Sequence, residues 1–191
     1  MPDKHVGERI RDLRRGRRLT LEQLAGTTGL TASFLSQMER NLTGVTLSSL
    51  VNIAKALEVP LRELVAQPAP AAPDTHQGAH QDYSVEPVSM HYERLSAAFP
   101  GSRLHAVKIR VPAGYASGLE SHEGEELLYI LAGRLECHVE HHAYHLGQGD
   151  SVHIDSHRPH RIANPGPAAT DLLWTSTFQV FDDSDHPFPP P

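Results

Sequence analysis

Residues 20–40 read TLEQLAGTTGLTASFLSQMER and predict two short helices joined by a tight turn. Thr20 is placed to cap the first helix, with Gln23 three residues later as its partner in a capping box. Gly29 is expected to end that helix, because glycine readily adopts the left-handed conformation that a helix C-terminus requires. Thr31 then caps the second helix. Local chemistry therefore specifies a helix, a turn and a second helix.

The second of these helices is predicted to have one apolar face and one polar face. Phe34, Leu35 and Met38 recur at helical spacing and form the expected inward stripe. The outward side chains are small or polar, as in the second helix of a helix-turn-helix, which lies in the DNA major groove. Gln37 can pair with adenine, whereas Arg40 is better placed for phosphates. The residues expected to contact DNA are Thr20, Gln23, Thr31, Ala32, Ser33, Ser36, Gln37 and Arg40.

The flanking segments extend the helical pattern over residues 7–66. Ile10 and Leu13 form the apolar side of an arginine-rich first helix. Thr46 is expected to cap a fourth helix, and Pro60 to begin a short fifth one. With these five helices the segment resembles the lambda-repressor-like, XRE-type DNA-binding domain, an all-α fold. The resemblance implies binding to double-stranded DNA; the alternative is a bundle of the same fold that has lost DNA binding.

Charge is distributed unevenly along the 191 residues. Residues 1–66 contain ten Lys and Arg against seven Asp and Glu, whereas the remainder has seven against sixteen. A basic segment suits a polyanion such as DNA, and an acidic one does not. Cys137 is the only cysteine, which excludes an intramolecular disulfide and is typical of a reducing cytoplasm. Because no apolar run reaches the roughly 18 residues of a membrane span and no signal segment is present, we expect a soluble cytoplasmic protein with no membrane partner.

A proline- and alanine-rich segment divides the chain into two domains. Residues 67–82 have no hydrophobic period and predict a semi-extended linker, and residues 182–191 predict a disordered tail. The intervening residues 83–181 contain short alternating runs, which favour an all-β sandwich or barrel that can hold one small ligand. A tight hairpin is expected at Ala132-Gly133, directly after the apolar run LLYIL. Strands are expected at 103–111, 126–131, 134–140, 151–154 and 171–180.

Two histidines and a carboxylate in this β-domain are spaced so that they can converge. His122 precedes Glu126 by four residues, and His160 lies in a later run that begins at Gly149. Side chains from different strands of a barrel can form a 2-His-1-carboxylate set, which leaves positions on a metal open. Neutral imidazole and carboxylate are the ligand forms, so metal binding is expected to weaken at low pH.

The same residues lie in segments that resemble the two cupin motifs. The first reads GYASGLESHEGEELLYILAG (114–133) and the second GDSVHIDSHRPHRIAN (149–164). The resemblance implies a cupin fold, a double-stranded β-helix or jelly roll, and a divalent metal (Zn, Fe or Ni). Glu120 replaces the first histidine of the motif's H-x-H pair. Because residues 120 and 122 share a strand face, Glu120 either ligates the metal or contacts a polar effector. The candidate metal ligands are His122, Glu126, His160 and Glu120.

An XRE-type domain (1–66) followed by a cupin domain (83–181) resembles a common family of bacterial transcriptional regulators, over almost the whole chain. The resemblance implies a homodimer that represses transcription and whose barrel senses a small-molecule effector, with or without a metal. Such an effector acts only if its affinity differs between two states of the protein. The side chains expected to contact the effector are Tyr115, Tyr129, Arg110 and Trp174.

The alternative is an enzyme, because the same architecture resembles the mononuclear iron epoxidases of phosphonate antibiotic synthesis. Those enzymes use a His–Glu–His triad and lack the first H-x-H histidine, so His122, Glu126 and His160 would be the iron ligands. Two observations argue against this alternative. The second helix keeps an outward DNA-reading face, and Arg18 stands where the epoxidases send a lysine into the active site. Arginine does not replace that lysine chemically, and we expect a regulator without catalytic residues.

Overall fold

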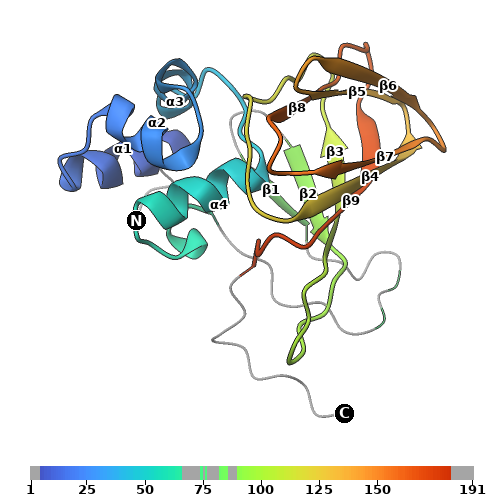
Figure 1. Ribbon diagram of the computed structural model, residues 1–191, viewed down its shortest axis with the longest axis horizontal. Coiled ribbons are helices and arrows are strands. Elements are labelled where there is room, and N and C mark those ends of the chain that lie inside the picture. Colours follow the sequence, from blue (N-terminus) through green and yellow to red (C-terminus); the bar gives the residue numbers. More distant parts are fainter. Residues whose placement is uncertain (1–4, 66–73, 75, 77–81, 86–89, 182–191) are drawn as a thin grey trace.

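The computed structural model describes residues 5–65, 74, 76, 82–85 and 90–181. The expected linker lies outside the described residues except at positions 74, 76 and 82, and the expected tail lies outside them entirely. A helical bundle lies beside a β-domain (Figure 1). No helix in the described ranges is long and apolar enough to cross a membrane. The helical elements are α1 (Val6–Gly16), α2 (Leu21–Thr28), α3 (Ala32–Glu39), α4 (Leu47–Ala56) and the 3-10 helix η1 (Leu61–Glu63).

The caps that define the helix-turn-helix form as predicted. The Thr20 hydroxyl accepts a hydrogen bond from the Gln23 amide at 3.1 Å, and the Gln23 side chain accepts one from the Thr20 amide at 2.8 Å. Gly29 ends α2 with a left-handed φ of 71°. The Thr31 hydroxyl then caps α3 by accepting from the Phe34 amide at 3.1 Å. These bonds satisfy amides that a helix N-terminus otherwise leaves unpaired.

Aliphatic side chains from all four α-helices form the core of the bundle. Leu35 and Met38 are buried in it, as predicted for the inward stripe of α3. Phe34 differs, because it is half-buried and packs on the β-domain: a Cβ atom built on Gly118 would lie 2.9 Å from its ring. Successive helical residues point about 100° apart, so residues 34 and 35 face different neighbours. The fully buried aliphatic residues of the bundle are Ile10, Leu24, Leu35, Leu50, Ile53, Leu57 and Leu64.

The β-domain consists of two antiparallel sheets whose inner faces are apolar. One sheet has the strand order β1-β2-β3-β9-β4-β7 and the other β6-β5-β8. Along β3 and β9 buried residues alternate with more exposed ones, which is the pattern of a sheet with one buried face. The strands are β1 (Asp82–Val85), β2 (Met90–Arg94), β3 (His105–Val111), β4 (Glu125–Ala132), β5 (Arg134–Val139), β6 (His142–Gly147), β7 (Ser151–Asp155), β8 (His160–Ala163) and β9 (Thr170–Ser176).

The prediction of a hairpin at Ala132-Gly133 is wrong. β4 pairs with β7 and β9, whereas β5 pairs with β6 and β8, so the turn carries the chain from one sheet to the other. Gly133 makes this turn with a φ of 90°, and a Cβ atom there would lie 2.7 Å from the Thr170 hydroxyl. An apolar run identifies a strand but does not specify its partner, and this is why the error arose.

Helix α4 connects the bundle to the β-domain at both of its ends. Before its N-terminus, the Val45 carbonyl accepts a hydrogen bond from the Tyr92 hydroxyl of β2 at 3.4 Å. Near its C-terminus, the Lys55 ammonium lies 4.4 Å from the centre of the Phe178 ring. The bundle is therefore packed on the β-domain in this structure, and its orientation depends on contacts made by α4.

Candidate functional site

His122, Glu126 and His160 converge inside the β-domain. Glu126 lies on β4, His122 in the segment that leads into β4, and His160 begins β8. The backbone amide of His122 donates to the Ser156 carbonyl at 2.8 Å, and His160 and Glu120 exchange two backbone hydrogen bonds at 2.8 and 2.9 Å. These bonds bring the three buried side chains together, with their ligand atoms within 4.8 Å of one another. The convergence predicted for these three residues is confirmed.

The hydrogen bonds of the two imidazoles leave the same nitrogen of each ring facing the centre of the site. Nδ1 of His122 lies 3.0 Å from the Glu123 carbonyl, and Nδ1 of His160 lies 2.9 Å from the Arg158 carbonyl. A carbonyl oxygen only accepts, so these contacts assign the proton to Nδ1 in each ring. Each Nε2 is then an acceptor, and metal-ligating histidines typically show this arrangement.

The Glu126 carboxylate lies between these two acceptors. Its oxygens are 3.0 Å from Nε2 of His122 and 3.6 Å from Nε2 of His160. Both Nε2 atoms and Oε1 of Glu126 are buried and make no hydrogen bond within the part of the chain that the structure describes. Buried acceptors that face one another require a cation or a proton between them. This donor set therefore fits a divalent metal with two imidazole ligands and one carboxylate ligand.

The protonation of His122 depends on the same neighbours. Burial lowers the pKa of its imidazole, but the Glu126 carboxylate, the Glu123 carbonyl and Glu120 together raise the pKa above its ordinary value. A proton on His122 then competes with a metal for the position beside Glu126. Because a ligating imidazole must be neutral, a metal held by these residues would bind more weakly as the pH falls.

Glu120 does not join the other three predicted ligands. Its carboxylate is directed at α4, where it accepts hydrogen bonds from the Thr46 hydroxyl at 2.8 Å and the Ser49 hydroxyl at 2.7 Å. Burial raises the pKa of Glu120, and the nearby His160 opposes that shift. The expectation of direct ligation by Glu120 is thus not met in this arrangement, because α4 provides hydrogen-bond donors to the carboxylate.

A small cavity lies between α4 and the interior of the β-domain. It encloses about 30 Å³, and Thr46, Glu120, Glu126, His160 and Trp174 are among the residues that line it. Ligand pockets usually have volumes of about 300–1,000 Å³. The cavity in this arrangement of the domains is therefore too small for an effector, although Trp174 has the position expected of an effector contact.

The other three predicted effector contacts do not line this cavity. Tyr129 is 40% exposed on the outer face of β4, between the inward Leu128 and Ile130. Tyr115 is buried, and burial raises the pKa of its hydroxyl above the ordinary value. Arg110 lies on the outer face of β3, so the expectation that Arg110 and Tyr129 face an effector inside the barrel is wrong. Side chains alternate along a strand, and Ile109 and Val111 take the inward positions.

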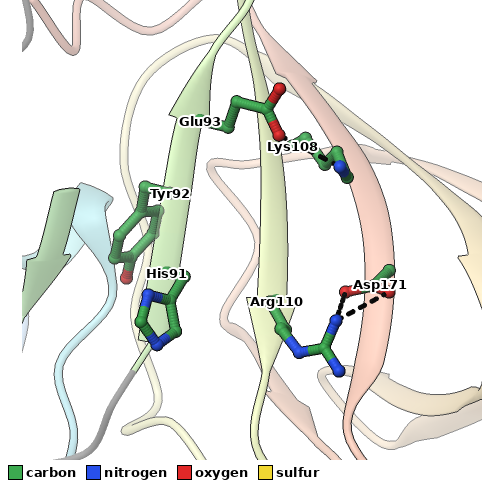
Figure 2. Close-up of a pocket in the computed structure, with 6 residues that line it drawn as sticks. All are labelled: His91, Tyr92, Glu93, Lys108, Arg110 and Asp171. Carbon is green, nitrogen blue, oxygen red and sulfur yellow. Dashed lines mark hydrogen bonds and ion pairs between the residues drawn. The ribbon is translucent and has the colours of Figure 1, made fainter. Parts of the chain in front are cut away.

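Arg110 instead lines a hollow on the outer surface of the sheet. Figure 2 shows it with its neighbours in this hollow, whose volume is about 280 Å³. Arg110 pairs with Asp171 at 3.3 Å, and Lys108 pairs with Glu93 at 3.0 Å (Figure 2). Each cation therefore has an acidic partner, and the hollow has no excess of positive charge with which to attract an anion.

The DNA-reading face predicted for α3 is accessible. Ser33, Gln37 and Arg40 are exposed, and Ala32 and Ser36 are half-buried beside them. The Arg40 guanidinium donates to the Ser36 carbonyl at 3.1 Å. The capping residues expected to contact the DNA backbone, Thr20, Gln23 and Thr31, are also exposed.

Sequence reasoning missed the buried pair that positions this face. Arg14 of α1 binds Glu39 of α3 through two contacts of 2.6 and 2.8 Å, and also donates to the Leu19 carbonyl at 2.8 Å. Because α1 contains several arginines, the sequence did not show that one of them, Arg14, forms a buried ion pair. The only signal was position: residue 14 follows Ile10 by four and therefore lies on the same helix face.

Comparisons with known proteins agree with this architecture. Two family models match the chain, Helix-turn-helix over residues 10–64 and Cupin domain over residues 107–176. The HTH-type transcriptional regulator PuuR of Escherichia coli is 26% identical over 179 residues, which cover 92% of this chain and 96% of PuuR. The HTH-type transcriptional regulator SutR of Escherichia coli is 26% identical over 159 residues, 82% of this chain and 85% of SutR.

Among solved structures, an HTH_3 family transcriptional regulator from Vibrio cholerae has the same fold. It superposes with a TM-score of 0.51 at 20% identity, covering 90% of this chain and 93% of that one. The capped helix pair, the two sheets and the family matches lead to one assignment. The chain combines a helix-turn-helix family domain with a C-terminal cupin family domain, and it is similar over most of its length to HTH-type transcriptional regulators.

Proposed function

We propose that this protein is a cytoplasmic, sequence-specific transcriptional regulator, and that it acts as a repressor whose cupin domain senses a small molecule. The observation that carries the proposal is α3, which is capped at Thr31 and exposes Gln37 and Arg40 on a small, polar face. Such a face allows close approach to base edges in the major groove. The relatives named as transcriptional regulators support it, since they align over most of their length.

The proposed DNA-binding species is a homodimer. Two recognition helices related by a two-fold axis contact half-sites one helical turn apart, about 34 Å or 10 base pairs. Selection of duplexes from a random library with the full-length chain tests both the binding and the symmetry. We expect an enriched inverted repeat with that spacing, and recovery of no common sequence would contradict the proposal.

We further propose that His122, Glu126 and His160 hold a divalent metal. When bound, the metal supplies positive charge to the buried acceptors and offers open positions to a ligand. The two Nδ1 contacts with backbone carbonyls hold the imidazoles in position, and this pre-organisation supports the proposal.

Replacing His160 with alanine is expected to lower Co²⁺ affinity by more than about 100-fold. Loss of an outer-shell contact already lowers metal affinity about 10- to 100-fold, and a direct ligand contributes more. Visible absorption during Co²⁺ titration measures the effect. His153→Ala is the matched control, because His153 is exposed and pairs with Glu125 away from the site. Equal Co²⁺ affinity for the wild type and His160→Ala would refute the metal assignment.

An oxygenase function receives less support. Arg18, which the sequence resemblance aligns with the active-site lysine of the epoxidases, is exposed just after α1 with a φ of 57°. The aligned relatives are named regulators rather than enzymes. Oxygen consumption by the Fe²⁺-loaded protein with phosphonate substrates is expected to remain at the level of a His160→Ala control.

A further inference from the structure

One buried carboxylate connects the two domains. Glu120 is 4% exposed and accepts hydrogen bonds from the Thr46 and Ser49 hydroxyls of α4, residues more than 70 positions away along the chain. The Thr46 hydroxyl is also the N-cap of α4, because it accepts from the Ser49 amide at 3.1 Å. A carboxylate beside a helix N-terminus is further stabilised by the positive end of the helix dipole. The contact between the domains therefore depends on the same atoms that begin α4.

The residues at the start of α4 form one wall of the cavity in the β-domain. Thr46 forms part of the cavity wall, together with Trp174 and the candidate ligands Glu126 and His160. The remaining volume of about 30 Å³ holds one or two water molecules but not an organic ligand. A molecule can thus occupy the cavity only after the first turn of α4 has moved away from Glu120.

The other end of α4 is also linked to the candidate metal site. The Lys55 ammonium lies 4.4 Å from the centre of the Phe178 ring, and that ring stacks on His122 with a centroid separation of 4.4 Å. Lys55 also pairs with Glu123, next to His122, at 3.4 Å. Displacement of α4 would therefore change contacts on both sides of the site and change the orientation of the bundle that carries α3.

We propose that the first turn of α4 is a latch on the cupin cavity, and that entry of a ligand releases the DNA-binding bundle from the β-domain. A buried carboxylate that loses two donors is strongly destabilised, so the ligand must bring its own hydrogen-bond donor to Glu120. The regulatory consequence rests on the proposed function, but the latch itself does not depend on DNA binding.

The sequence provides a probe for the latch, because Trp174 is the only tryptophan and lines the cavity. A hydrogen bond to a charged group changes an opening equilibrium about 10- to 150-fold. In the full-length chain, Ser49→Ala is expected to increase acrylamide quenching of Trp174 fluorescence. It should also accelerate amide hydrogen exchange in the peptide covering α4 by about tenfold or more. Ser49 belongs to the bundle, so this change leaves the β-domain side of the cavity intact.

Two further variants make the test specific. Asn52→Ala removes another polar side chain of α4, which does not line the cavity and donates no hydrogen bond to Glu120, and is expected to behave like the wild type. In a Glu120→Gln background, Ser49→Ala should have a much smaller effect, because the charge that strengthened the bond is absent. The latch would be overturned if Ser49→Ala showed the same quenching and amide exchange as the wild type. It would also be overturned if Ser49→Ala had the same effect in the Glu120→Gln background as in the wild type. Since the assay contains no DNA, this outcome is separate from a failure to select an operator.

Discussion

Glu39→Ala is expected to lower the free energy of unfolding of the helical bundle by about 3–5 kcal/mol, because it leaves the Arg14 cation buried without its partner. The pair is bidentate, with Nε–Oε1 and Nη2–Oε2 distances of 2.6 and 2.8 Å, and both side chains are buried. The same hydrogen bond raises the pKa of Arg14, although burial opposes that shift. Urea denaturation followed by helical circular dichroism measures the loss.

Two variants distinguish this effect from general destabilisation. Glu63→Ala removes an exposed carboxylate from η1 and should change stability by less than about 0.5 kcal/mol. The double variant Arg14→Met, Glu39→Leu should recover most of the lost stability, because apolar replacement of a complete buried pair is often neutral. If Glu39→Ala unfolds at the same urea concentration as Glu63→Ala, the pair does not stabilise the bundle.

Gln37→Ala is expected to weaken binding to the selected operator by about 1–3 kcal/mol while leaving binding to random duplex unchanged. Gln37 is exposed on α3 and can form two hydrogen bonds with one adenine, so its loss affects only the cognate sequence. Arg40→Ala should instead weaken binding to all duplexes alike and reduce the salt slope by about one. Fluorescence anisotropy with labelled duplexes at several salt concentrations measures both effects.

Gln148→Ala provides the matched control for this series. Gln148 is exposed in the turn before Gly149, on the β-domain rather than on α3, and its loss should not change either affinity. An equal loss of affinity for operator and random duplex in Gln37→Ala would mean that Gln37 does not read a base.

The parts of the fold that were predictable depend on neighbouring residues. The Thr20–Gln23 capping box, the left-handed Gly29 and the Thr31 cap involve partners within about one helical turn. Such contacts form from local sequence alone, so both ends of α2 and the start of α3 could be predicted from the capping residues and their spacing. The metal-ligand candidates were predictable for a different reason, namely the resemblance of their segments to the cupin motifs.

The parts that were not predictable depend on contacts between distant residues. Glu39 lies 25 residues from Arg14, and Glu120 lies 74 residues from Thr46. Neither spacing has a local pattern that favours one partner over another. In β4, the run LLYIL is apolar on both faces, so alternation did not show that Tyr129 points outward. For Arg110 the signal was present, since the flanking Ile109 and Val111 indicate the buried face of β3.

The same distinction applies to the domain arrangement. The sequence resemblance predicted a DNA-binding domain and a cupin domain, but not that the start of α4 forms one wall of the cupin cavity. Glu120 was recognised as a departure from the motif, but the structure does not show it as a metal ligand, because its carboxylate accepts hydrogen bonds from Thr46 and Ser49. Its donors could not be predicted, because they belong to another domain. The role of a residue that departs from the motif therefore depends on its contacts with the neighbouring domain as well as on its position in the motif.

The most direct test of the account is a titration of the full-length chain with the selected duplex and with a scrambled duplex of equal length and composition, at several salt concentrations. The account predicts a preference for the selected duplex of at least about 1,000-fold near physiological salt, as is typical of specific regulators. Equal affinity for the two duplexes at every salt concentration would contradict it.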